Sequence, residues 1–185
     1  MLPSGYVFRN SHATILEWLN EASRIAQRPR HEQEAEWARL SSGIAARKSN
    51  YFEVLPNLFA FLLMPAVEQA AKAGNRHYAQ IGCARLMIAL ERHRLKAKSW
   101  PDAAKLESAL APSLLPSWPR DAFVDAPLKL EKTADGWRIW SVGPEKKPDG
   151  MSPQKNQRII YRLLDPEKRR RPQPAKAADK PQEAQ

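Results

Sequence analysis

The sequence has 185 residues, a formal net charge of +10, 16 prolines and a mean hydropathy of −0.60. An apolar fraction of 43% suffices for one ordinary core plus extensions. The single cysteine, Cys83, excludes an intrachain disulfide and a cysteine metal cluster, and its apolar helical neighbours predict a buried thiol. The positive charge is spread along the chain, so it favours acidic partners without selecting nucleic acid or anionic lipid.

The N-terminal region does not have the pattern of a secretory signal. Arg9, Asn10, His12 and Glu17 interrupt any continuous apolar segment there. The most apolar run, residues 54–67, spans about 14 residues, whereas a membrane-crossing helix needs about 20. We therefore expect neither a signal peptide nor a full membrane span in this sequence. An alternative is that the chain is the C-terminal part of a longer membrane protein.

Two amphipathic helices are predicted before residue 50. The first runs from residue 12 to about residue 27 and can be capped by Asn10 or Ser11. The second covers residues 31–46. Each has one apolar side, so we expect each to pack on the other or on the helix that follows. Residues 1–57 are assigned to an N-terminal helical extension.

A long helix is predicted to begin between Pro56 and Pro65 and to end near Lys98. Apolar residues cover two sides of it around residues 81–90, which predicts burial against more than one layer. Gly74 marks a weak point where the helix can bend or break, because glycine costs about 1 kcal/mol relative to alanine in a helix.

The stretch after this helix carries an ordered series of breaks. Trp100-Pro101 separates the long helix from a short one predicted over residues 103–110. Leu115-Pro116 and Pro119 then exclude helix, because proline lacks the backbone donor and restricts the residue before it.

A β-hairpin is predicted from two strand-like runs, residues 127–132 and 137–142, around a turn that contains Gly136. A lone two-stranded hairpin is only marginally stable. We therefore expect it to pack on the long helix, with Trp118 and Phe123 covering the joint between helix and sheet.

Residues 158–164 are predicted to form a further strand or a short helix, and we favour the strand. From Asp165 onwards the composition is Lys, Arg, Pro, Ala and Gln with no aromatic residue, which is typical of a disordered tail. The chain is thus divided at residues 57 and 164, and residues 165–185 form a basic tail. The predicted fold class is α+β: amphipathic N-terminal helices, one long helix packed by a small antiparallel sheet, and a disordered C-terminal tail.

The order of these motifs resembles the C-terminal domain of type II secretion pseudopilins. It is closer still to the uncharacterised pseudopilin-like proteins of planctomycete-type bacteria. Within residues 58–150 the shared features are the long helix ending in Trp-Pro, a Leu-Pro and Pro-x-Asp-x-Phe loop, a hairpin, and Trp-Ser-x-Gly-Pro followed by Asp149-Gly150. The resemblance implies a structural or protein-interaction module of the cell envelope or of type II secretion, with other protein subunits as partners.

The apolar run at residues 58–67 has two interpretations. In pseudopilins an apolar N-terminal helix lies in the membrane and in the filament core, and this run is similar to a shortened counterpart. However, no Gly-Phe-x-x-x-Glu leader precedes it, and Pro56 and Pro65 frame a short segment. We therefore favour a soluble core segment and keep the filament segment as the alternative.

One loop of the pseudopilin pattern is linked to calcium. In major pseudopilins the loop after Ser-x-Gly is acidic and binds this ion. Here the loop offers Glu145 and Asp149, and Lys146 and Lys147 offset their charge. Calcium prefers about six to eight oxygen ligands. We therefore expect no metal and no cofactor, and interpret Asp149-Gly150 as a turn.

No residue pattern indicates an enzyme. The four histidines fall into no ligand spacing, and no phosphate-binding loop, nucleophile elbow or Cys-x-x-Cys motif is present. We expect a non-catalytic protein.

The tail holds a basic run formed by Lys168, Arg169, Arg170 and Arg171. Such a run can contact nucleic acid or an anionic lipid surface. No aromatic residue is interleaved for base stacking, so a solvated tail is expected. The alternative function is a basic adaptor that binds polyanions through these side chains.

Overall fold

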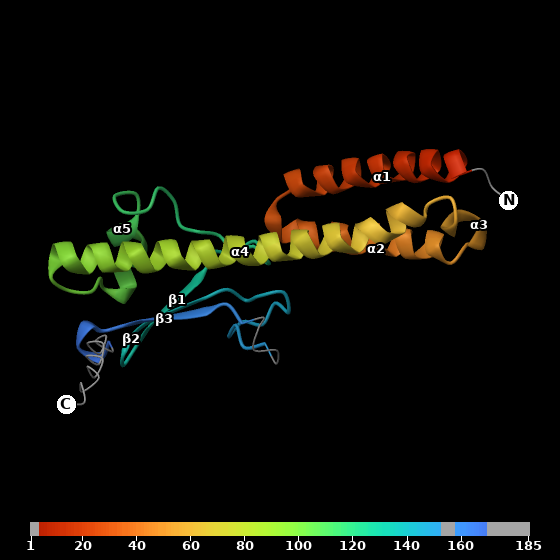
Figure 1. Ribbon diagram of the computed structural model, residues 1–185. Coiled ribbons are helices and arrows are strands. Elements are labelled where there is room, and N and C mark those ends of the chain that lie inside the picture. The colour runs from red at the N-terminus through yellow and green to blue at the C-terminus, as the bar shows by residue number, and fades with distance from the viewer. Residues whose placement is uncertain (1–3, 153–157, 170–185) are drawn as a thin grey trace, which may run out of the picture.

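The computed structural model describes residues 4–152 and 158–169, and it confirms the α+β class (Figure 1). The molecule has a helical half and a half that contains a small sheet. One long helix runs through both. In chain order the elements are α1 (Ser4–Gln27), α2 (Arg30–Lys48), α3 (Tyr51–Val54), α4 (Leu58–Ala97), η1 (Ala103–Lys105), α5 (Leu106–Leu110), β1 (Lys129–Thr133), β2 (Gly136–Trp140), β3 (Ile160–Leu164) and η3 (Pro166–Lys168).

The long helix α4 is the axis of the molecule. Its 40 residues extend for about 60 Å, with α1 and α2 along its N-terminal half and the sheet along its C-terminal half (Figure 1). The helix is continuous through Gly74, where a bend or break was predicted. Packing from α2 supports this turn, because Arg30 donates to the buried Asn75 side chain at 3.1 Å and stacks on the ring of Tyr78.

The N-terminal core forms where α1 and α2 pack on α4. Its buried members are Trp18, Ala22, Ile25, Trp37, Ala60, Phe61 and Met64. The helix α1 begins at Ser4, well before the predicted start at residue 12. A tertiary contact accounts for this early start, since Phe8 stacks on Phe59 of α4 with ring centroids 5.3 Å apart.

The apolar run at residues 58–67 belongs partly to this core. Ala60, Phe61 and Met64 are buried, whereas Phe59 and Leu62 are exposed. Among the residues that the structure describes, no helix combines the length and the apolarity that a membrane crossing requires.

The sheet has the strand order β1-β2-β3 and is antiparallel throughout, as predicted for the hairpin and the further strand. In the hairpin Lys129 pairs with Trp140, and Thr133 pairs with Gly136. The turn needs glycine at position 136, because φ is 136° and a Cβ atom there would clash with the backbone oxygen of Leu163.

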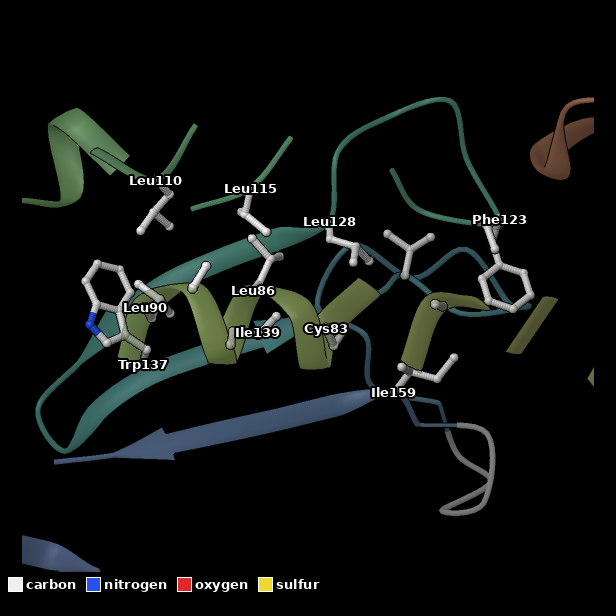
Figure 2. Close-up of a cluster of buried hydrophobic side chains, with 14 residues drawn as sticks. Cys83, Leu86, Leu90, Leu110, Leu115, Phe123, Leu128, Trp137, Ile139 and Ile159 are labelled. Carbon is white, nitrogen blue, oxygen red and sulfur yellow. The ribbon is translucent and has the colours of Figure 1, made fainter. Parts of the chain in front are cut away.

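The C-terminal core lies between the sheet and α4 (Figure 2). Leu86 and Leu90 of α4 are completely buried there, together with Trp137 and Ile139 of β2. Leu110, Leu115, Leu128, Phe123 and Ile159 close the sides of this core. The predicted covering of the joint by Phe123 and Trp118 is confirmed, since Phe123 is buried and Trp118 packs against the cluster.

The folded part of the chain continues past the predicted boundary at residue 164. The indole of Trp100 donates to Asp165 at 2.7 Å, and the guanidinium of Arg169 donates to the Leu164 carbonyl at 2.9 Å. The tail prediction is therefore corrected for residues 165–169, where specific partners offset the cost of ordering polar residues. Residues 170–185 lie outside the described residues.

Candidate functional site

One side of α4 carries an exposed apolar row that neither core covers. Its residues recur at intervals of three or four positions, with one interval of seven, which places them on one side of a helix. We call this row the outer face. It consists of Phe59, Leu63, Ala66, Ala70, Ala73, His77, Ile81, Ala84, Ile88 and Leu95, all of them exposed to solvent.

The side of α4 that faces the sheet is apolar as well. We call it the inner face, and its members are Ala79, Gly82, Cys83, Leu86, Ala89 and Leu90, all of them buried. Figure 2 shows Cys83, Leu86 and Leu90 directed into the C-terminal core. The two apolar sides that the sequence indicated are therefore both real. Around residues 81–90 the sheet and the segment with Leu110 and Leu115 both pack against the inner face, whereas the outer face has no covering layer within the described chain.

The outer face has few polar interruptions. None of its members is Asp, Glu, Lys or Arg, and its one titratable side chain is His77, whose Nδ1 lies 3.2 Å from the side-chain oxygen of Gln80. The exposed fractions of Ile81 and Ile88 are 60% and 59%. From Phe59 to Leu95 the row extends for about 54 Å. Soluble monomers rarely expose apolar patches larger than a few hundred Å², so the outer face is the candidate interaction surface.

The Pro-x-Asp-x-Phe and Ser-x-Gly-Pro motifs meet at one buried carboxylate. Asp121 Oδ1 accepts hydrogen bonds from the Phe123 amide at 3.0 Å and from the Ser141 hydroxyl at 2.8 Å. Its Oδ2 accepts from the Val142 amide at 2.9 Å, and the Gly143 amide donates to the Ser141 oxygen at 3.0 Å. A buried carboxylate needs such donors. We call this network the Asp121 junction; it ties the loop before β1 to the end of β2.

Cys83 lies close to the Asp121 junction and is fully buried, as predicted. Burial raises the pKa of its thiol to about 12, and the negative charge of Asp121 adds to the effect. The thiolate is the reactive form of cysteine. Cys83 is therefore a neutral packing residue at physiological pH.

The two carboxylates of the loop that matches the calcium loop of pseudopilins have local partners. Glu145 accepts a hydrogen bond from Ser152 at 2.8 Å and lies 3.3 Å from the ammonium of Lys147. Asp149 accepts from the Met151 amide at 2.9 Å. Within residues 4–152 and 158–169, no three His, Cys, Asp or Glu side chains gather into a group that could hold a metal ion. The structure thus gives Glu145 and Asp149 roles in shaping their own loop.

The basic run at the start of the tail is divided by the structure. Lys168 forms an ion pair with Asp135 in the β1–β2 turn, and Arg169 pairs with a glutamate of α4. Arg170 and Arg171 lie outside the described residues. Two of the four predicted polyanion contacts are therefore engaged by the folded part of the chain.

Glu91 on α4 accepts hydrogen bonds from two arginines in different parts of the chain. Arg94 is one turn away on the same helix, and the two nitrogens of Arg169 lie 3.1 and 2.7 Å from the carboxylate oxygens. Hydrogen bonds from Arg94 first, and then from Arg169, lower the pKa of Glu91 to about 2. The pair fixes the start of the tail against α4.

A hollow of about 540 Å³ lies between α2, α4 and the loops next to the sheet. Three of its charged groups, Glu34, Glu68 and Lys72, take part in ion pairs. Glu68 contacts the Lys72 ammonium at 2.6 Å and the Ser41 hydroxyl at 2.8 Å. Glu34 lies 3.8 Å from the ammonium of Lys146. The Ser41–Glu68 hydrogen bond joins α2 to α4, and the Glu34–Lys146 ion pair joins α2 to the loop after β2, so we assign the hollow a structural role.

Comparison with known proteins does not place the chain in a family. No protein-family model matches it, and neither does any curated protein or solved structure. The features that indicate the class of protein are therefore the outer face and the motifs that meet at the Asp121 junction.

Proposed function

We propose that this chain is a non-catalytic, pseudopilin-like module that assembles with other protein subunits of a bacterial cell envelope or of a type II secretion machinery. The observation that carries the proposal is the outer face of α4. It is a long apolar surface without charged members on a rigid helix, which is what a protein partner can cover.

The arrangement of the motifs supports the pseudopilin-like part of the proposal. A long helix packed at its C-terminal half by a small antiparallel sheet is the architecture that the resemblance implies. The two loop motifs that carry the resemblance, around Asp121 and Ser141, are hydrogen-bonded to each other at 2.8 Å. The aspartate of one motif and the serine of the other are therefore needed for the same contact in this chain.

The states of the reactive groups support a non-catalytic role. Cys83 is buried with a raised pKa. Asp121 already accepts three hydrogen bonds. The outer face offers aliphatic and aromatic side chains and His77, which suit contact with another protein better than bond chemistry.

The polyanion-binding adaptor is less well supported. Lys168 and Arg169 are held by Asp135 and Glu91, so binding a phosphate with them would require breaking these pairs. The adaptor remains a distinct outcome of the test below.

Site-specific photo-crosslinking in the cells that make the protein tests the proposal. A photoreactive amino acid at Ile88 or Leu62, on or beside the outer face, should give adducts with proteins of the cell-envelope fraction. The same group at Lys105 or Glu107, exposed positions away from α4, is the matched control and should not. Adducts with nucleic acid, or equal protein adducts at the control positions, would contradict the proposal.

A further inference from the structure

The outer face has a gradient of side-chain size along α4. Ala66, Ala70 and Ala73 make its N-terminal half shallow, with Phe59 and Leu63 at the start. Ile81, Ile88 and Leu95 make its C-terminal half bulky, with Ala84 between them. His77 lies at the centre of the row, equally far from both ends.

This gradient is self-complementary when two copies of α4 run antiparallel. If the two helices face each other with His77 at the crossing point, the shallow half of each helix meets the bulky half of the other. The facing pairs are Ala73 with Ile81, Ala70 with Ala84, Ala66 with Ile88, and Phe59 with Leu95. Two of these pairs, Ala73 with Ile81 and Ala66 with Ile88, place a large residue opposite a small one, which lets the side chains interdigitate. A parallel pair would instead place each isoleucine against the same isoleucine of the other copy.

The area is sufficient for a specific dimer. A row about 54 Å long and about 10 Å wide buries on the order of 500 Å² per copy, or about 1,000 Å² in total, which is near the lower limit for specific interfaces. Phe8, stacked on Phe59 at the end of the row, widens this surface.

The charged groups in or beside the row are Glu91, which fills the interval between Ile88 and Leu95, and the exposed Arg85 and Arg92 at its edge. Glu91 would lie opposite Leu63 of the second copy. Its carboxylate is already paired with Arg94 and Arg169 of its own chain. Arg85 and Arg92 are exposed at the edge of the row, where long side chains keep their charged ends in water. A two-fold axis through His77 also uses the same patch on both copies, which closes the assembly at two subunits.

We propose that the outer face binds a second copy of this chain, antiparallel and with the two-fold axis at His77. The proposal rests on the proposed function, because it names the partner of the same surface. The failures of the two are distinguishable. Crosslinks from Ile88 only to other envelope proteins would overturn the dimer alone, whereas the absence of protein crosslinks would overturn the proposed function.

Cysteine crosslinking of the purified full-length chain tests the geometry. His77→Cys should form a disulfide-linked dimer on mild oxidation. Ile81→Cys alone should not, because an antiparallel pair separates the two residues by about 12 Å, beyond the reach of a disulfide. Mixing Ala73→Cys with Ile81→Cys should restore a crosslinked heterodimer. The unmodified chain, whose Cys83 is buried, is the control and should stay uncrosslinked.

Sedimentation equilibrium tests the affinity. Ile81→Glu should raise the dissociation constant about a hundredfold or more, because it buries two unpaired like charges at the centre of the dimer. Gln69→Glu adds the same charge to an exposed position of α4 outside the row and should leave the constant within about threefold.

Three results would overturn the proposal. The first is a wild-type chain that stays monomeric at about 100 μM. The second is a disulfide dimer of Ile81→Cys alone, which indicates a parallel pair. The third is a monomer that binds vesicles of mixed zwitterionic and anionic lipid and loses that binding in Ile81→Glu, which would assign the outer face to a membrane surface.

Discussion

Leu86 and Ile88 lie two residues apart on α4 and have similar side chains, yet Leu86 is completely buried and Ile88 is 59% exposed. Leu86 belongs to the inner face, which the sheet covers, and Ile88 to the outer face, which nothing in the described chain covers. The difference shows that one helix serves two purposes here. Its inner face stabilises the folded chain, and its outer face is free to contact another molecule.

The largest contrast is expected between alanine substitutions on the two faces. Leu86→Ala should reduce the free energy of unfolding by about 2–5 kcal/mol, because it removes buried methyl groups and leaves a cavity. Ile88→Ala should change it by no more than about 0.5 kcal/mol in the monomer. Urea unfolding at a concentration that keeps the chain monomeric measures both. Equal losses would show that the outer face is covered within one chain.

Loss of the Asp121 junction should reduce the free energy of unfolding nearly as much, although the junction lies outside α4. Asp121→Ala leaves the Val142 amide, the Phe123 amide and the Ser141 hydroxyl without their acceptor. Each unsatisfied buried donor costs about 1–3 kcal/mol, so we expect a loss of at least about 2 kcal/mol. Ser141→Ala, which removes one of these donors and leaves the carboxylate in place, should cost less. A thermal midpoint unchanged by Asp121→Ala would contradict a structural role for the junction.

A smaller effect with a defined pH dependence is expected at Glu91. Because its pKa is lowered from 4.5 to about 2 in the folded chain, its stabilisation is present above about pH 4.5 and is lost as the pH falls towards 2. Glu91→Gln should therefore cost about 1 kcal/mol at neutral pH, and the gap to the wild type should close in acid. Urea unfolding between pH 2 and pH 7 measures this gap, with the exposed Glu107→Gln as control. A gap that is constant down to pH 2 would exclude the ion pairs as its cause.

Truncation of the tail tests how much the contacts of residues 165–169 contribute to stability. Deleting residues 170–185 leaves Asp165, Lys168 and Arg169 in place. Deleting residues 165–185 removes these three residues and so their contacts with Trp100, Asp135 and Glu91. The longer deletion should lower the thermal midpoint by about 2–4 °C for a loss of about 1 kcal/mol. Differential scanning calorimetry of the two truncated chains measures the difference. Equal midpoints would mean that these contacts contribute little.

The smallest expected effect has opposite signs on the two sides of α4. Gly74→Ala should raise stability by up to about 1 kcal/mol, because a Cβ atom there would meet only Arg30, at 4.0 Å. Gly82→Ala should lower stability or leave it unchanged, because its Cβ would lie 2.7 Å from Leu128 in the core, and overpacking offsets the helical gain. Thermal midpoints of the two variants measure the sign. A gain for both would show that the inner face is loosely packed.

Much of the fold could be predicted from local sequence signals. The positions of Pro101, Pro116 and Gly136 marked the helix end, the irregular loop and the hairpin turn, because proline and glycine restrict or free the backbone regardless of context. The start of α1 could not be predicted, since it depends on Phe8 stacking on Phe59, which is distant in sequence. The continuity of α4 through Gly74 likewise depends on Arg30 of another helix.

The candidate site was less predictable than the fold. The sequence indicated that α4 is apolar on two sides, but periodicity does not say which side the sheet covers. The positions of Lys168 and Arg169 were not predictable either. A charge run looks solvated in sequence, and Glu91, the partner of Arg169, is 78 residues away.

By itself the sequence determined that this chain has two amphipathic helices, one long helix with two apolar sides, and a hairpin after a series of proline breaks, because these features follow from local backbone chemistry and from the helical period. Only the tertiary structure decided that the inner face is the covered one, that Asp121 joins the two loop motifs, and that the chain remains folded to Arg169. These outcomes depend on contacts between residues far apart in the chain, and such contacts form only when the whole core is assembled.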